Sequence, residues 1–147
     1  MKKKIIFLFL FVFILVTFSG CTHIEDTNGA EDYTIETFTD DDIIKKSSYS
    51  ALGFVETNIN GKITIKISKF SGVYEITSLN PKNETLVFTV ESKCSLGNFR
   101  IVLIKDDAII RDILINTTEK VEIENANGKY IMKIVGESAN FSLTITK

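Results

Sequence analysis

Residues 61–68, Gly61-Lys62-Ile63-Thr64-Ile65-Lys66-Ile67-Ser68, alternate strictly between polar and apolar side chains after the glycine. A period of two places the three isoleucines on one face of a β-strand and the polar side chains on the other. The same period recurs later in the chain, at Leu86/Phe88/Val90, Phe99/Ile101/Leu103, Val121/Ile123, Tyr130/Met132/Ile134 and Phe141/Leu143/Ile145. The pattern predicts a protein built mainly from β-strands that bury one face.

Short runs of turn-forming residues separate these strands at intervals of about 10–12 residues. They are Asn60-Gly61, Ser71-Gly72, Asn80 to Asn83, Ser95 to Gly97, Asp106-Asp107, Asn127-Gly128 and Gly136-Glu137. Many short alternating strands with regular turns favour a sandwich or a barrel. We expect an all-β fold, an antiparallel, jelly-roll-like β-sandwich of eight or nine strands. The strands are expected near residues 52–58, 62–69, 73–79, 85–92, 98–105, 108–115, 119–124, 129–135 and 139–146.

The turn at Asn60-Gly61 allows two pairing registers. A two-residue turn sets Ile65 opposite Glu56, whereas a three-residue loop sets Ile65 opposite Val55. The three-residue loop keeps one face of the hairpin apolar and is therefore the predicted register.

The turn at Asn127-Gly128 favours a two-residue hairpin. That hairpin pairs Ile123 with Met132 on the buried face and sets Glu122 opposite Lys133 on the outer face. The closing stretch, residues 128–145, resembles the last hairpin of secreted bacterial jelly-roll modules, in which a Gly-x-Tyr-x-Ile-x-Val strand precedes a Phe-x-Leu-x-Ile strand. This resemblance implies a fold and no site residues.

One segment, residues 99–104, is apolar at every position except Arg100. Val102 and Ile104 must point away from the face that carries Phe99. Either the strand is covered on both sides, for example by a helix near residues 39–48, or Val102 and Ile104 form a surface that meets a partner. The covered strand is the favoured interpretation.

The first twenty-one residues form a segment of their own. Lys2, Lys3 and Lys4 precede an uninterrupted apolar run over residues 5–16, and small residues follow up to a cysteine. A basic start and a short apolar core are typical of a signal peptide, because a spanning helix needs ~20 apolar residues. The sequence Phe18-Ser19-Gly20-Cys21 resembles the lipobox of bacterial lipoproteins, whose usual form is Leu-Ala/Ser-Gly/Ala-Cys.

The lipobox resemblance implies a lipid anchor. In that family the cysteine sulfur carries diacylglycerol, and the signal peptidase cleaves immediately before the cysteine. On this chain, cleavage falls between Gly20 and Cys21, and Cys21 becomes the lipid-modified first residue. Two or more acyl chains hold a protein stably at a membrane. An uncleaved anchor and an ordinary secretory signal peptide are the alternatives.

An acidic segment follows the cysteine. Residues 22–47 contain eight Asp and Glu against two Lys, whereas residues 48–147 contain eleven Asp and Glu against twelve Lys and Arg. Such an acidic stretch is typical of an extended tether. Within it, Thr39 followed by Asp40, Asp41 and Asp42 predicts a short helix near residues 39–46. The expected organisation is a signal peptide at 1–20, a tether at 21–48 and a β-sandwich domain at 49–147.

Several kinds of chemistry lack the residues they need. The sole histidine, His23, lies in the tether, so the domain offers no Ser-His-acid triad. We expect Cys94 to be a half-buried structural thiol, and we expect no metal site and no cofactor. The domain is nearly neutral and so lacks the basic face typical of nucleic-acid binding, and no nucleic acid is expected. The adjacent Asp106 and Asp107 are interpreted as a turn rather than as a catalytic pair.

Aromatic side chains provide one further feature to place. A sugar-binding platform requires exposed rings, and the candidates are Tyr33, Tyr49, Tyr74 and Tyr130. Strand parity places Tyr74 and Tyr130 on core faces.

The predicted lipid anchor and the predicted β-sandwich fold together indicate a class of function. We expect a lipid-anchored lipoprotein on the extracytoplasmic face of the cell membrane, or at an outer membrane if the cell has one. Its β-domain is expected to be a non-catalytic module that binds an envelope protein or a wall polymer. A carboxylate-dependent hydrolase on a sandwich scaffold and a purely structural surface protein are the alternatives.

Overall fold

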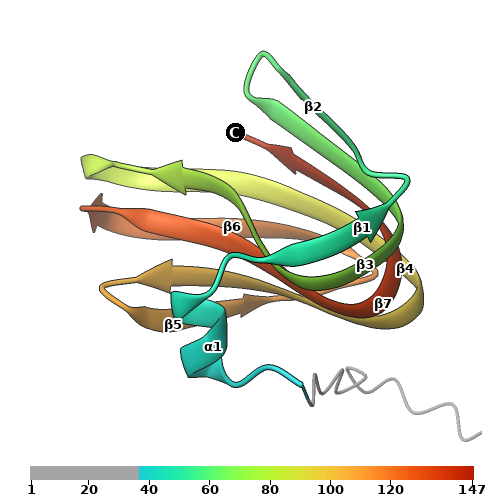
Figure 1. The fold of residues 1–147 in the computed structure, drawn as a ribbon. Helices are drawn as coiled ribbons and strands as arrows, with labels where there is room; N and C mark the ends of the chain where they lie inside the picture. Colours follow the sequence, from blue (N-terminus) through green and yellow to red (C-terminus); the bar gives the residue numbers. More distant parts are fainter. Residues whose placement is uncertain (1–36) are drawn as a thin grey trace, which may run out of the picture. The chain divides into compact units, whose positions relative to one another are not determined.

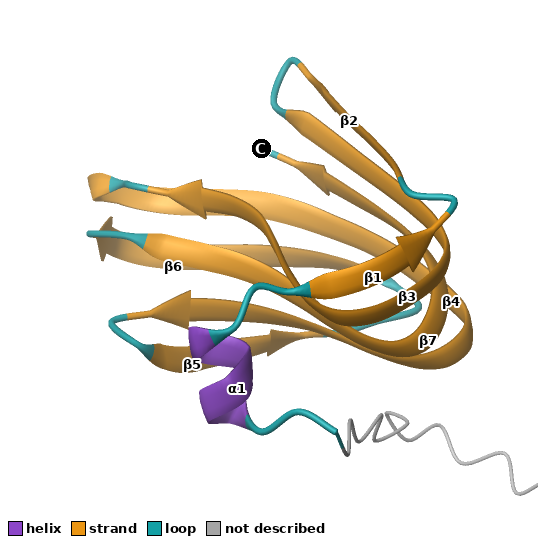
Figure 2. Ribbon diagram, viewed as in Figure 1, coloured by secondary structure: helices purple, strands orange, loops and turns teal. Residues whose placement is uncertain are grey.

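A computed structural model describes residues 37–147, and this part of the chain is almost entirely β-structure (Figures 1 and 2). It contains one short helix and seven strands, all paired antiparallel in one sheet. The elements are α1 (Asp40–Lys45), β1 (Tyr49–Leu52), β2 (Val55–Ile59), β3 (Lys62–Leu79), β4 (Lys82–Lys105), β5 (Ala108–Ile113), β6 (Thr118–Asn127) and β7 (Tyr130–Thr146). The predicted all-β antiparallel fold is confirmed.

Three long strands, β3, β4 and β7, bend and fold the sheet back on itself (Figure 1). Residues 130–136 of β7 lie between the ends of β3 and β4, and β5 continues this first layer beyond β4. Residues 141–146 of β7 lie between the beginnings of β3 and β4. The strands β2 and β6 border this second layer. The result is a sandwich-like fold made from one sheet.

The strand count differs from the expected eight or nine because three glycine-containing sites are bends rather than turns. The expected strands 62–69 and 73–79 are one strand, β3, whose register shifts around Gly72. In the same way β4 continues through Gly97, and β7 continues through Gly136. A bulge bends a strand while its pairing continues on both sides. Conversely, the expected strand 52–58 is divided between β1 and β2 at Gly53.

The register predicted at Asn60-Gly61 is wrong. The turn has two residues, both with positive φ (51° and 78°), and it sets Ile65 opposite Glu56. Two positive φ angles define the type I′ turn that matches strand twist. Glu56 is tolerated beside the apolar face because its carboxylate accepts a 2.6 Å hydrogen bond from the Tyr74 hydroxyl.

The hairpin predicted at Asn127-Gly128 is also wrong. Ile123 pairs with Leu86 of β4 in the second layer, whereas residues 130–136 of β7 lie in the first layer, and β6 does not pair with β7. Residues 128–129 therefore connect the two layers, and the resemblance to a closing jelly-roll hairpin fails because β7 is one bent strand. Alternation determines which face of a strand is buried. It does not determine which other strand pairs with it, because any antiparallel strand with its apolar side chains on the same face is compatible.

The core lies between the two layers. Phe99 and Phe141 stack there with ring centroids 4.0 Å apart, and Phe70 meets Phe141 edge-on at 5.8 Å. All three side chains are buried and lie close to the bends. Aromatic packing therefore fills the corner where the sheet folds over.

Helix α1 covers the outside of the first layer. Its Ile43 is fully buried against Val73, Val135, Val102 and Ile104. The covered-strand interpretation is therefore correct, and Val102 and Ile104 form no exposed partner surface. The helix lies where the sequence predicts it, but it packs as part of the folded domain rather than as part of a tether.

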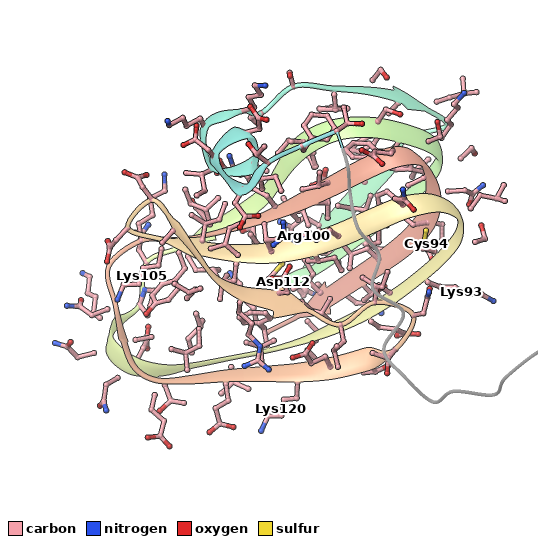
Figure 3. All side chains as sticks on the ribbon, turned by 90° about the horizontal axis from the view of Figure 1, so that it is seen from below. Lys93, Cys94, Arg100, Lys105, Asp112 and Lys120 are labelled. Atoms are coloured by element: carbon pink, nitrogen blue, oxygen red, sulfur yellow. The ribbon has the colours of Figure 1, made fainter. Side chains whose placement is uncertain are left out.

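The N-terminal end of α1 is held by a capping box and an ion-pair cluster. The Thr39 hydroxyl accepts a hydrogen bond from the Asp42 amide, and the Asp42 carboxylate accepts one from the Thr39 amide. A hydrogen bond from Lys46, and then those from Thr39, lower the pKa of Asp42 to about 2. Arg100 on β4 forms one ion pair with Asp40 on the helix, at 2.6 Å, and another with Asp112 on β5, at 2.5 Å (Figure 3). The helix is thereby tied to two strands beneath it.

Candidate binding face

The predicted lipidation site Cys21, the predicted cleavage site after Gly20, and the residues His23 and Tyr33 lie outside the described part of the chain. Cys94 is half-buried, as expected, and its Sγ lies 3.3 Å from the carbonyl oxygen of Leu96. Burial raises the pKa of the Cys94 thiol. A raised pKa reduces the thiolate fraction at neutral pH, which fits a structural role.

The other candidate residues lie mostly where turn chemistry and parity place them. Asp106 and Asp107 form the two-residue turn between β4 and β5, with φ angles of 49° and 57°. Tyr130 is buried and Tyr74 packs against the core, whereas Tyr49 is 45% exposed. Across residues 37–147, no group of three or more His, Cys, Asp and Glu side chains is arranged to hold a metal ion.

The outward side of the second layer carries a surface rich in lysine and hydroxyl groups, here called the lysine–hydroxyl face. It follows from the alternation in β3, because burial of Ile63, Ile65 and Ile67 turns the intervening side chains outward. The neighbouring strands repeat this parity. The face consists of Val55, Thr57, Ile59, Lys62, Thr64, Lys66, Ser68, Thr89, Glu91, Lys93, Ser142, Thr144 and Thr146.

The pairing registers align two lysines across the centre of this face. Ser142 on β7 pairs with Lys66 on β3 and with Lys93 on β4. Two strand spacings separate the lysine backbones by roughly 10 Å. Figure 3 shows the Lys93 side chain pointing away from the sheet. The two ammonium groups thus flank a serine in one row of the sheet.

A shallow depression of about 400 Å³ lies between these lysines, where the layer approaches its bend. Its polar lining consists of Lys66, Ser68, Lys93, Ser95, Asn140 and Ser142. The Ser95 hydroxyl lies 3.0 Å from Oδ1 of Asn140 and 3.2 Å from the Asn140 carbonyl oxygen. No carboxylate of residues 37–147 lines the depression, so the described lining carries a positive charge.

Within residues 37–147, the two lysines of the depression have no counter-ion. Among the described residues, Lys45, Lys46 and Lys120 form ion pairs, and Lys133 contacts backbone carbonyl groups. Within that same range, Lys66 and Lys93 form neither an ion pair nor a hydrogen bond. Both side chains are exposed. Their charges are therefore available to a ligand.

A second depression, of about 560 Å³, lies beside the bends of β3 and β7 and includes Tyr49 and Glu137. The Glu137 carboxylate accepts a 2.7 Å hydrogen bond from the Thr37 amide and a 3.0 Å hydrogen bond from the Asn98 side chain. These contacts fasten the residues before α1 to the bend of the sheet. Glu137 thus has a structural role, and the lysine–hydroxyl face is the stronger candidate for binding.

Sequence reasoning did not single out Lys66, Lys93 or Ser142. Alternation alone places each of them on a polar face, but it does not say that β7 lies between β3 and β4. No protein-family model matches the chain, and no curated protein sequence matches it.

Proposed function

We propose that this protein is a cell-envelope lipoprotein whose β-domain is a non-catalytic binding module. The observation that carries the binding role is the lysine–hydroxyl face, in which Lys66 and Lys93 are exposed and have no counter-ion within residues 37–147. The partner is an envelope protein or a wall polymer. The adjacent carboxylates considered for a hydrolase, Asp106 and Asp107, form a tight turn and give that alternative no support.

The proposed anchor is diacylglycerol on Cys21, after cleavage between Gly20 and Cys21. The lipobox-like sequence, the basic start and the short apolar core support it. In the part of the chain that the structure describes, no helix is long and apolar enough to span a membrane. The proposed location is the extracytoplasmic face of the cell membrane.

Replacing Cys21 with serine tests the anchor. We expect Cys21→Ser either to leave the precursor uncleaved or to release the protein from the membrane, because the hydroxyl cannot form the thioether. Fractionation of cells and the apparent mass of the protein measure this outcome. Cys94→Ser is the matched control and is expected to leave both unchanged. A Cys21→Ser protein with unchanged fractionation and unchanged mass contradicts the anchor.

Photo-cross-linking in intact cells tests the binding face. A photoreactive residue at Thr64, in the middle of the face, is expected to form adducts with a specific neighbour. The same residue at Asp107, in the β4–β5 turn, is the control and is expected to form few. Mass analysis of the adducts identifies a protein or a polymer. Equal adduct formation at both positions, or none at either, contradicts a binding role for this face.

A further inference from the structure

The depression between Lys66 and Lys93 has the chemical character of an anion site. It combines two ammonium groups, which have no counter-ion within residues 37–147, with the hydroxyl groups of Ser68 and Ser142. Hydroxyl and ammonium groups both donate hydrogen bonds to anionic oxygens. The nearest acidic residue on the face is Glu91, which lies two residues before Lys93 on β4 and pairs with Thr144.

We propose that this depression binds the phosphodiester groups of a polyol-phosphate polymer. The inference rests on the proposed binding function and names the ligand class of the same face. Phosphate fits this site because lysine binds phosphate as a point charge and needs no planar, bidentate arrangement. The two arginines of the described chain, Arg100 and Arg111, are already paired with carboxylates elsewhere.

The shape of the site favours a polymer over a small molecule. The depression is open and shallow, whereas small-molecule sites are usually concave enough to bury most of their ligand. Lysine backbones roughly 10 Å apart let the two side chains reach either one phosphate or two consecutive phosphates of a flexible chain. The hydroxyl groups of Thr64, Thr144 and Thr57 continue along the next row and match a hydroxyl-rich backbone.

Binding is measured with the full chain, purified in detergent, and a fluorescently labelled glycerol-phosphate oligomer of ten units. We expect saturable binding that weakens as the salt concentration rises, because the contacts are ionic. The double substitution Lys66→Gln/Lys93→Gln is expected to weaken binding at least tenfold, since each lysine near an anionic surface contributes several-fold. Glu91→Gln is expected to strengthen binding about twofold, because it removes a negative charge that repels the phosphate groups of the oligomer.

The matched control is Lys82→Gln/Lys129→Gln. It removes the same charge from two exposed lysines outside the depression, one at the start of β4 and one just before β7, and it is expected to change affinity less than twofold. Equal losses in the two double variants overturn the proposal, because they indicate binding through net charge alone. Absence of binding to the oligomer, or equal binding of uncharged polyglycerol, also overturns it.

Vesicles of phosphatidylglycerol separate a polymer from a membrane surface. Binding to these vesicles but not to the oligomer overturns the proposal in favour of lipid head groups, which exposed Val55 and Ile59 on the same face would assist. If photo-cross-linking at Thr64 captures a neighbour while the oligomer does not bind, the ligand class fails and the binding module stands. If both experiments fail, the binding module fails as well.

Discussion

Replacing Gly97 with alanine is expected to lower the free energy of unfolding by ~3 kcal/mol or more. Gly97 has a φ of +74°. A Cβ at this position would overlap the backbone carbonyl oxygens of Glu137 and Ser138, far inside van der Waals contact. A left-handed conformation alone costs a residue with a Cβ ~1–2 kcal/mol. The overlap with backbone atoms adds to this cost, because the two bends cannot separate without breaking the pairing of β4 with β7.

The matched control for this prediction is Gly128→Ala. Gly128 has a similar φ of +82°, but a Cβ there would meet nothing within 4 Å. Its expected cost is therefore ~1 kcal/mol, from the backbone conformation alone. Urea unfolding followed by circular dichroism gives both values, and the difference between them isolates the close approach of the two bends. Equal losses in the two variants contradict the assigned role of Gly97.

The bends also show how far the sequence determines the fold. Alternation correctly assigns Ile63, Phe99 and Phe141 to the buried face, because burial follows strand parity whichever strands are neighbours. The segment around Gly97 has the composition of a turn, and glycine with serine suits a turn and a bulge equally well. Only the continued pairing with β7 on both sides distinguishes them. That pairing is a long-range property that a local pattern does not contain.

The same limit applies to the candidate site. The outward orientation of Lys66 and Lys93 follows from their own strands and is predictable. Their alignment through Ser142 depends on residues 141–146 of β7 lying between β3 and β4, whereas the sequence predicted a closing hairpin between residues 129–135 and 139–146. The helix over Val102 was predictable because an apolar outer face needs a cover. The residue that fixes the helix there was not, because Lys133 was expected to face Glu122 on the solvent side.

Replacing Lys133 with methionine is expected to lower the free energy of unfolding by ~2–4 kcal/mol. Only 4% of Lys133 is exposed. Its Nζ donates hydrogen bonds of 3.0, 2.9 and 2.9 Å to the carbonyl oxygens of Ile43, Ile44 and Lys46. The last carbonyl groups of a helix have no partners within the helix, and a positive charge near them also complements the helix dipole. A hydrogen bond to a charged group typically contributes a net ~1.5–3 kcal/mol, and full burial of the ammonium group lowers the total.

Desolvation opposes these contacts and makes methionine the informative substitution. Burial lowers the pKa of Lys133, and Glu75 partly offsets that effect. Methionine keeps the apolar stem of the side chain, so the measured loss reports the ammonium group and the carbonyl groups left without a donor. Lys129→Met, at an exposed lysine just before the same strand, is the control and is expected to change stability by less than ~0.5 kcal/mol.

The Lys133 substitution further distinguishes a local from a global role. Helix α1 covers Val102, Val135 and Ile104, so its release exposes a contiguous apolar patch. We expect Lys133→Met to increase hydrogen exchange of the α1 amides and the binding of a hydrophobic dye. The β7 amides that pair with β3 and β4 are expected to stay protected. Unchanged exchange at α1 together with unchanged stability contradicts the proposed clamp. Loss of protection throughout the sheet would instead mean that the helix and the sheet unfold as one cooperative unit.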